Sequence, residues 1–123
     1  PRLTLIEGDF FQSVPSADAY ILANVMFNWN DERARSLLAN IRAAMGSGGT
    51  MYVLDLFQDG SFESAFLNLD ELVTTGGTCR TRDAAFELLR QCGYSVTEVL
   101  RGDGPFSYYP ARYDRIVAPF YPP

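Results

Sequence analysis

An apolar run that breaks off into polar and aromatic residues carries the clearest chemical potential in this chain. Residues 18–26 read Asp-Ala-Tyr-Ile-Leu-Ala-Asn-Val-Met, and Phe27, Asn28 and Trp29 follow directly. Open α/β sheets bind ligands at the carboxyl ends of their strands, where such a run would end. The Asn28 amide can donate or accept a hydrogen bond to a substrate hydroxyl or carbonyl group, and Trp29 offers an aromatic wall. The stretch therefore predicts one wall of a pocket.

Asp55 is the second candidate for chemistry, because it stands near the end of another apolar run, residues 50–57. Its carboxylate could act as a base, accept a hydrogen bond from a substrate, or simply end the strand. We predict Asn28 and Asp55 as the catalytic residues. Each has a structural alternative: Asn28 could serve the start of the following helix, Trp29 could pack in the core, and Phe27 could line a pocket without further function.

Composition limits the possible partners and the available bases. The chain has 123 residues, 47% of them apolar, with a net charge of −5, two cysteines and no histidine. An acidic chain without a basic stripe argues against nucleic acid and against an anionic membrane. No secretory pattern and no run of 18 apolar residues occurs, so we expect one cytoplasmic domain with buried, reduced thiols. We expect no metal site.

Strands and helices alternate in the predicted order. Leu3 to Glu7 is expected to form a short buried strand, and Asn30 is expected to cap a helix that stops at Gly46. Thr81 is expected to cap a later helix that ends at Gly93. The remaining elements are strands over 18–26 and 50–57, a helix over 62–73, a loop over 74–80 that carries two glycines, and a final antiparallel strand pair over 96–100 and 113–119.

Three segments resemble the small-molecule O-methyltransferase family. They are Glu7-Gly8-Asp9-Phe10-Phe11, the stretch from Asn28 to Glu32, and Gly76-Gly77 followed by Arg80-Thr81. Phe27 stands where the family has its general-base histidine, and Cys79 stands where most members have a second catalytic glutamate. The anthracycline 4-O-methyltransferase and aclacinomycin 10-hydroxylase group shares these apolar replacements, so the chain is most similar to that group.

The resemblance implies S-adenosylmethionine as the cofactor and a small aromatic substrate. Asp9 would accept a hydrogen bond from the adenine amine, Phe10 would pack on the ring, and Ala23 would lie beside the cofactor. The implied substrate-binding residues are Phe27, Asn28, Trp29, Glu71 and Arg80. Glu71 could instead face water, and Arg80 could pair with a carboxylate of the protein instead of the ligand. Phe106, Tyr108, Tyr109 and Tyr113 could roof a flat substrate or form an ordinary turn.

The implied fold class is α/β, the C-terminal part of a Rossmann-like methyltransferase sheet. That sheet would be mostly parallel, its last strand pair would be antiparallel, and its first two strands would be missing. No Gly-x-Gly-x-x-Gly turn occurs in the chain. We therefore expect residues 1–123 to form a partial catalytic domain that lacks the Gly-rich cofactor half and the N-terminal dimerisation domain. Cofactor binding would then need the missing portion or a complementary chain, and the full-length protein would be a homodimer.

Three functions follow from this resemblance. The first is methylation of an aromatic, polyketide-like natural product by positioning, without a histidine base. The second uses the same fold for decarboxylative hydroxylation or another tailoring reaction. The third is a non-catalytic pseudo-methyltransferase or partner subunit.

Overall fold

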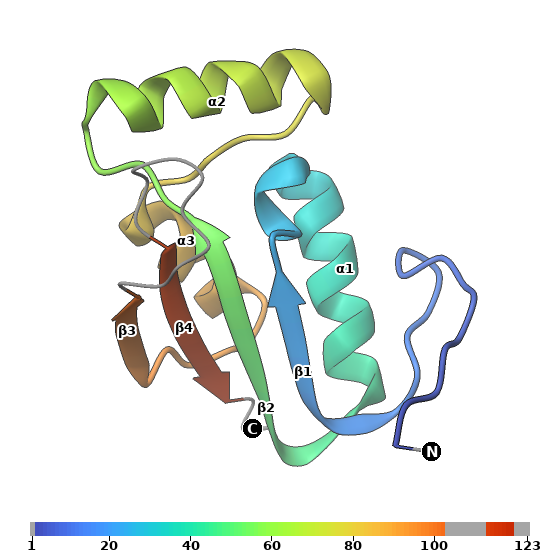
Figure 1. Cartoon of the computed structure of the whole chain (residues 1–123). Helices are drawn as coiled ribbons and strands as arrows, with labels where there is room; N and C mark the ends of the chain where they lie inside the picture. Colours follow the sequence, from blue (N-terminus) through green and yellow to red (C-terminus); the bar gives the residue numbers. More distant parts are fainter. Residues whose placement is uncertain (1, 103–112, 120–123) are drawn as a thin grey trace.

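A mixed four-stranded sheet forms the centre of the molecule (Figure 1). The computed structural model describes residues 2–102 and 113–119. The strand order is β1-β2-β4-β3, in which β1 pairs parallel with β2, whereas β4 pairs antiparallel with both β2 and β3. The strands are β1 (Ala17–Ala23), β2 (Met45–Leu56), β3 (Glu98–Gly102) and β4 (Tyr113–Pro119). The α/β fold class and the antiparallel last pair are confirmed.

The helices are a short 3-10 helix η1 (Met26–Asn28), α1 (Asp31–Ala44), α2 (Phe62–Thr74) and α3 (Arg82–Gln91). Helices α1 and α3 begin at the predicted caps, Asn30 and Thr81. The Asn30 side chain accepts from the Arg33 amide at 3.0 Å, and the Thr81 hydroxyl accepts from the Ala84 amide at 3.2 Å. Both side chains satisfy a free N–H of the first helical turn.

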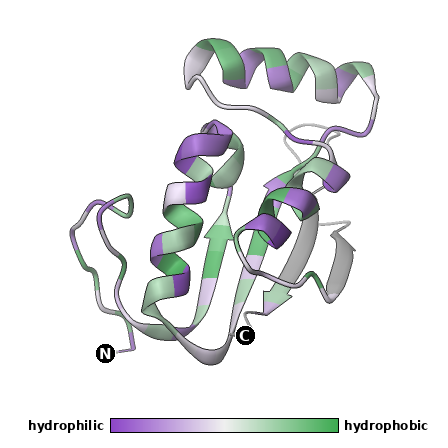
Figure 2. Ribbon diagram, turned by 180° about the vertical axis from the view of Figure 1, so that it is seen from behind, coloured by the Kyte–Doolittle hydropathy of each residue, from purple (hydrophilic) through white to green (hydrophobic). Residues whose placement is uncertain are grey.

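The core lies between the sheet and the two helices α1 and α3, which cover the same face (Figure 2). The predicted inward positions Ala34, Leu37, Leu38 and Ile41 of α1 are all buried. Tyr94 follows α3, and its hydroxyl donates to the Leu38 carbonyl at 2.8 Å inside this layer. The opposite face of the sheet is more open, since Ile21 and Tyr52 remain 69% and 39% exposed.

The predicted stop of α1 is confirmed, since Gly46 directly follows the Met45 C-cap, but β2 begins earlier than the predicted residue 50. The helix ends at Ala44, and Met45 already belongs to β2, where it pairs with Ala17 and is buried. Pairing with β1 supplies hydrogen bonds that a glycine-rich turn would leave to water, so tertiary context extends the strand toward the helix.

The predicted buried strand at Leu3 to Glu7 is also wrong. These residues form no strand, and Leu3, Leu5 and Ile6 are 75%, 87% and 66% exposed. A strand needs a neighbour for its N–H and C=O groups, and nothing among the described residues pairs with this segment. The described sheet therefore runs without a gap from β1 to β3, and β1 is its edge.

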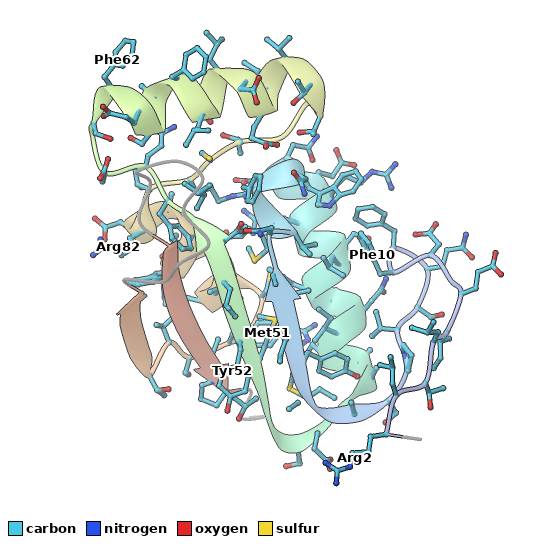
Figure 3. The ribbon with its side chains drawn as sticks, viewed as in Figure 1. Arg2, Phe10, Met51, Tyr52, Phe62 and Arg82 are labelled. Atoms are coloured by element: carbon cyan, nitrogen blue, oxygen red, sulfur yellow. The ribbon has the colours of Figure 1, made fainter. Side chains whose placement is uncertain are left out.

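Helix α2 lies beyond the carboxyl ends of β1 and β2, apart from the sheet (Figure 1). Ser64 is its one buried residue. Figure 3 shows Phe62 pointing away from the rest of the molecule, and this side chain is 81% exposed. Phe66, Leu69 and Val73 are also more than half exposed. Helix α2 contacts the loop that follows it, because Asn68 Oδ1 accepts from the Cys79 amide at 2.8 Å.

Candidate active site

The carboxyl end of β1 bends sharply into the residues that the sequence singled out. Asn24 adopts a left-handed conformation with φ of 56°, and its amide donates to the Leu54 carbonyl at 2.8 Å. Asparagine tolerates this region better than most residues. The bend leads into Met26–Trp29, which we call the η1 turn. Sequence reasoning missed Asn24, although an asparagine at a strand end is a possible signal for such a bend.

The η1 turn is held by hydrogen bonds from two other parts of the chain. The Phe27 amide donates to Asp55 Oδ2 at 3.1 Å, and the Thr78 amide donates to the Phe27 carbonyl at 2.8 Å. Arg80 donates from Nη1 to the Met26 carbonyl at 3.0 Å and from Nη2 to the Trp29 carbonyl at 2.9 Å. The conformation of the turn is therefore set by β2 and by the loop between α2 and α3.

Asp55 lies behind the η1 turn and is only 2% exposed. Besides the Phe27 amide, the carboxylate accepts from the Leu56 amide at 3.2 Å. Burial raises the pKa of Asp55 from 3.8 to about 7, because the loss of water outweighs the two amide donors and the charge of Arg80. A small cavity beside it, lined also by Met26, Phe27 and Arg80, has room for about one water molecule. Asp55 can hold a proton near neutral pH, but it faces the protein interior.

Arg80 pairs with a protein carboxylate, which is one of the two alternatives that the sequence left open. Its Nε and Nη2 lie 2.9 Å and 2.8 Å from Asp31 Oδ1. The Arg80 side chain is 6% exposed and that of Asp31 is 61% exposed. A buried guanidinium is tolerated when its donors are paired, and here the partners are Asp31 and two carbonyls of the η1 turn.

The cofactor candidates meet the substrate candidates at an aromatic cluster. The Phe11 ring lies 4.7 Å from both Phe10 and Trp29, and Phe10 lies 6.1 Å from Trp29. The Arg33 guanidinium sits 4.6 Å above the Phe11 ring. Figure 3 shows Phe10 beside the N-terminal end of α1. The fold therefore brings residues 9–11 against a residue that follows them by almost twenty positions.

Asp9 and Phe10 both remain accessible beside this cluster. Asp9 Oδ1 accepts from the Phe11 amide at 2.9 Å, and its Oδ2 accepts from Gln12 Nε2 at 3.3 Å. These contacts orient an exposed carboxylate next to a ring that is 37% exposed. An acceptor beside an aromatic face matches the amine edge and the flat faces of adenine. Ala23, at the end of β1, is also exposed.

Asn28 and Glu71 each contact a residue four positions away in the chain. Asn28 Nδ2 donates to the Asn24 carbonyl at 2.9 Å, so part of the amide serves the bend after β1. Glu71 is half-buried on α2, and its Oε2 accepts from the Thr75 hydroxyl at 3.1 Å. The predicted roof residues Phe106, Tyr108 and Tyr109, and the Tyr113 side chain, lie outside the described residues.

The Cys79 thiol is buried near Asp55, Glu71 and Arg80. Burial, with the nearby charges of Asp55 and Glu71, raises its pKa to about 11. A thiol in this state is a poor nucleophile at neutral pH.

Across residues 2–102 and 113–119, His, Cys, Asp and Glu side chains form no group of three that could hold a metal ion. No helix in this part of the chain is long and apolar enough to cross a membrane.

Residues 1–95 match the family model described as an O-methyltransferase domain. The chain belongs to the O-methyltransferase family. It is 37% identical over 105 residues to acetylserotonin O-methyltransferase of Gallus gallus, which covers 81% of this chain. It is 39% identical over 101 residues to aclacinomycin 10-hydroxylase RdmB of Streptomyces purpurascens, which covers 77% of this chain.

A solved family structure confirms the Rossmann-like expectation. Human N-acetylserotonin methyltransferase in complex with SAM superimposes with a TM-score of 0.79 at 30% identity and covers 95% of this chain. This chain spans 33% of that structure, and 30% and 27% of the chicken and Streptomyces relatives. The O-methyltransferase family is thus shown for a stretch that corresponds to about a third of those proteins.

Proposed function

We propose that this chain forms the cofactor- and substrate-facing part of an S-adenosylmethionine-dependent O-methyltransferase that acts on an aromatic, polyketide-like natural product. One observation carries the proposal: the Asp9–Phe10 segment lies against Trp29, next to the turn that bears Phe27 and Asn28. A candidate adenine site and a candidate substrate wall thus adjoin. Membership of the family and the SAM-bound human relative support this assignment.

The residues present fit the adenosine end of the cofactor. The Asp9 carboxylate would accept from the adenine amine, Phe10 would pack on the ring, and the small side chain of Ala23 leaves the strand end open for the ligand. When bound, S-adenosylmethionine supplies an electrophilic methyl group. The Gly-rich turn that would hold its other end is not in this sequence. We therefore propose that residues 1–123 act as a partial catalytic domain, and that a further portion or a complementary chain completes the site in a homodimer.

Positioning, and not an imidazole base, would drive methyl transfer here. Phe27 replaces the usual histidine, and the chain contains no histidine at all. An acidic phenol ionises without help, so the remaining task is to hold its oxygen in line with the methyl group. Such placement alone can contribute roughly 7–11 kcal/mol. Asn28 would orient the hydroxyl, while Phe27 and Trp29 exclude water. Asp55 remains a candidate base, although its contact with the Phe27 amide supports a role in holding the turn.

A second tailoring reaction is favoured by the 39% identity to a protein named as a 10-hydroxylase. In that alternative the same site would carry out a decarboxylative hydroxylation. Its simplest form, with Arg80 bound to a substrate carboxylate, has little support, because Arg80 is buried against Asp31. A non-catalytic partner subunit is the third possibility, and it predicts cofactor binding without turnover.

Calorimetric titration with S-adenosylmethionine tests the proposed cofactor site. Two proteins would be titrated, namely this chain and the longest natural form that contains it. Each would be compared with its Asp9→Asn variant and with Asp18→Asn as the control. Asp18 is an exposed carboxylate on β1, away from the aromatic cluster. Asparagine keeps an acceptor oxygen but lacks the charge, and a hydrogen bond to a charged group is worth about 1 kcal/mol more than one to a neutral group, so Asp9→Asn should weaken binding by roughly 5- to 10-fold. Equal affinities of the two variants in the long form would refute the assigned adenine site.

A further inference from the structure

Three backbone carbonyls of the η1 turn accept hydrogen bonds from one segment that is distant in sequence. The carbonyls of Met26 and Trp29 accept from Arg80, and that of Phe27 accepts from the Thr78 amide. We call Gly77–Arg80 the clamp. Its contacts cross about fifty positions of sequence, so they fix the turn from outside its own strand and helix. Without the clamp, a short 3-10 turn has few bonds of its own to define it.

Gly77 lets the clamp approach this closely. A Cβ atom at Gly77 would collide with the Phe27 carbonyl oxygen and with the Asn28 carbonyl group. The backbone of the clamp therefore lies directly against the two residues whose side chains we assign to the substrate. The Cys79 amide is held in turn by Asn68 Oδ1 of α2 at 2.8 Å, which ties the clamp to that helix.

The shape of the arginine side chain is essential to this arrangement. Nε and Nη2 share Asp31 Oδ1, while Nη1 and Nη2 reach carbonyls at the two ends of the η1 turn. The planar guanidinium presents these donors in a fixed fork, whereas a lysine ammonium is a compact point charge. Lysine could keep the positive charge near Asp31 but could not span both carbonyls. The contacts thus depend on geometry as well as on charge.

We propose that Arg80 is a positioning residue, which sets the direction of Phe27 and Asn28 through the η1 turn and through its pairing with Asp31. The kinetic consequence rests on the proposed function, but the effect on the turn does not. Arg80 would then govern the rate of the chemical step more than the stability of the fold. Displacement of a substrate-orienting group by about 1 Å can cost on the order of 10²-fold in rate.

Trp29 gives a direct optical test, because it is the only tryptophan of the chain and its carbonyl accepts from Arg80. The variants are Arg80→Lys and Asp31→Ala, with Glu32→Ala as the matched control. Asp31 and Glu32 both place a carboxylate in the first turn of α1, but only Asp31 pairs with Arg80 among the described contacts. We expect Arg80→Lys and Asp31→Ala to shift Trp29 emission to longer wavelength and to increase its quenching by acrylamide, and Glu32→Ala to do neither.

A lower melting temperature with unchanged emission and quenching would overturn the proposal and reduce Arg80 to a stabilising residue. If Arg80→Lys does not fold, Asp31→Ala decides, since the Asp31 side chain is 61% exposed and is not part of the buried core. In the complete enzyme, kcat should fall by up to about 10²-fold with KM nearly unchanged. A rise in KM alone would contradict the positioning role. If the complete protein transfers no methyl group, the proposed function fails, while the optical test still decides the role of Arg80.

Discussion

At the level of single residues, the site contrasts two buried ionisable groups. Arg80 is buried with its charge satisfied by Asp31 and by backbone carbonyls. Asp55 is buried with amide donors but without a direct ion pair, and its pKa rises to about 7. Arg80 is therefore held in one geometry by several partners, whereas Asp55 changes its protonation near neutral pH.

The raised pKa of Asp55 predicts a particular dependence of stability on pH. Between about pH 4 and pH 7 the folded chain keeps a proton that the unfolded chain has lost, so the free energy of unfolding falls as pH rises through this window. A shift of about three units corresponds to on the order of 4 kcal/mol. Asp55→Asn removes the titration, so the variant should gain stability relative to wild type from about pH 4 to about pH 7. Urea unfolding across this range measures the difference.

Asp59→Asn is the control with the opposite sign. Hydrogen bonds from Ser61 and Ser64 lower the pKa of Asp59 to about 2, so its contribution is already complete above about pH 5 and is lost only as pH falls further. The difference between Asp59→Asn and wild type should thus stay flat from about pH 5 to pH 8. A curve for Asp55→Asn that is equally flat would show that Asp55 is ionised in the folded chain.

At the level of helices and strands, local signals predicted most of the framework. Caps such as Asn30 and Thr81, and the apolar spacing of α1, depend on neighbours in sequence and were confirmed. The strand at Leu3–Glu7 was wrong because no described residue pairs with this segment, and a local apolar pattern does not show whether a pairing partner exists. Of the candidate site, the sequence predicts Phe27, Asn28 and Trp29, and these roles stay predictions. The bonds from Arg80 and Thr78 to the η1 turn depend on tertiary contacts that no motif displays.

The clamp provides a test of how closely these elements pack. Gly77→Ala would force a Cβ atom into the backbone of Phe27 and Asn28, and overpacking of this kind costs about 1–3 kcal/mol. Gly8→Ala is the control, because nothing lies within 4 Å of the added Cβ. Thermal or urea unfolding should show a loss for Gly77→Ala and a change within about 0.5 kcal/mol for Gly8→Ala. Equal stability of the two variants would mean that the clamp does not touch the turn.

For the molecule as a whole, a buried apolar core is accompanied by several large apolar side chains that are exposed. Leu89 is fully buried between α3 and the sheet, whereas Phe66 on α2 is 58% exposed. The relatives are about three times as long as this chain. The sequence has no Gly-x-Gly-x-x-Gly turn, and among the described residues β1 pairs with β2 alone. The described core joins β1, β2 and β4 to α1 and α3, while α2 adds little buried apolar area.

This division predicts unequal costs for two large-to-small substitutions. Leu89→Ala opens a cavity in the core and should lower the free energy of unfolding by about 2–5 kcal/mol. Phe66→Ser removes an exposed ring and should change it by no more than about 0.5 kcal/mol. Urea unfolding of both variants gives the comparison. A cost for Phe66→Ser as large as that for Leu89→Ala would mean that α2 packs against the rest of the chain in solution.

The most direct measurement of the central claim is transfer of an isotopically labelled methyl group. The longest natural form that contains this chain would be incubated with methyl-labelled S-adenosylmethionine and a dihydroxyanthraquinone, and the product mass would be determined. We predict a product that carries the label on a phenolic oxygen, formed without any histidine in residues 1–123. If the protein binds the cofactor but leaves the substrate unchanged, or converts it to a hydroxylated product without the label, that result would contradict the O-methyltransferase assignment and favour the alternative roles.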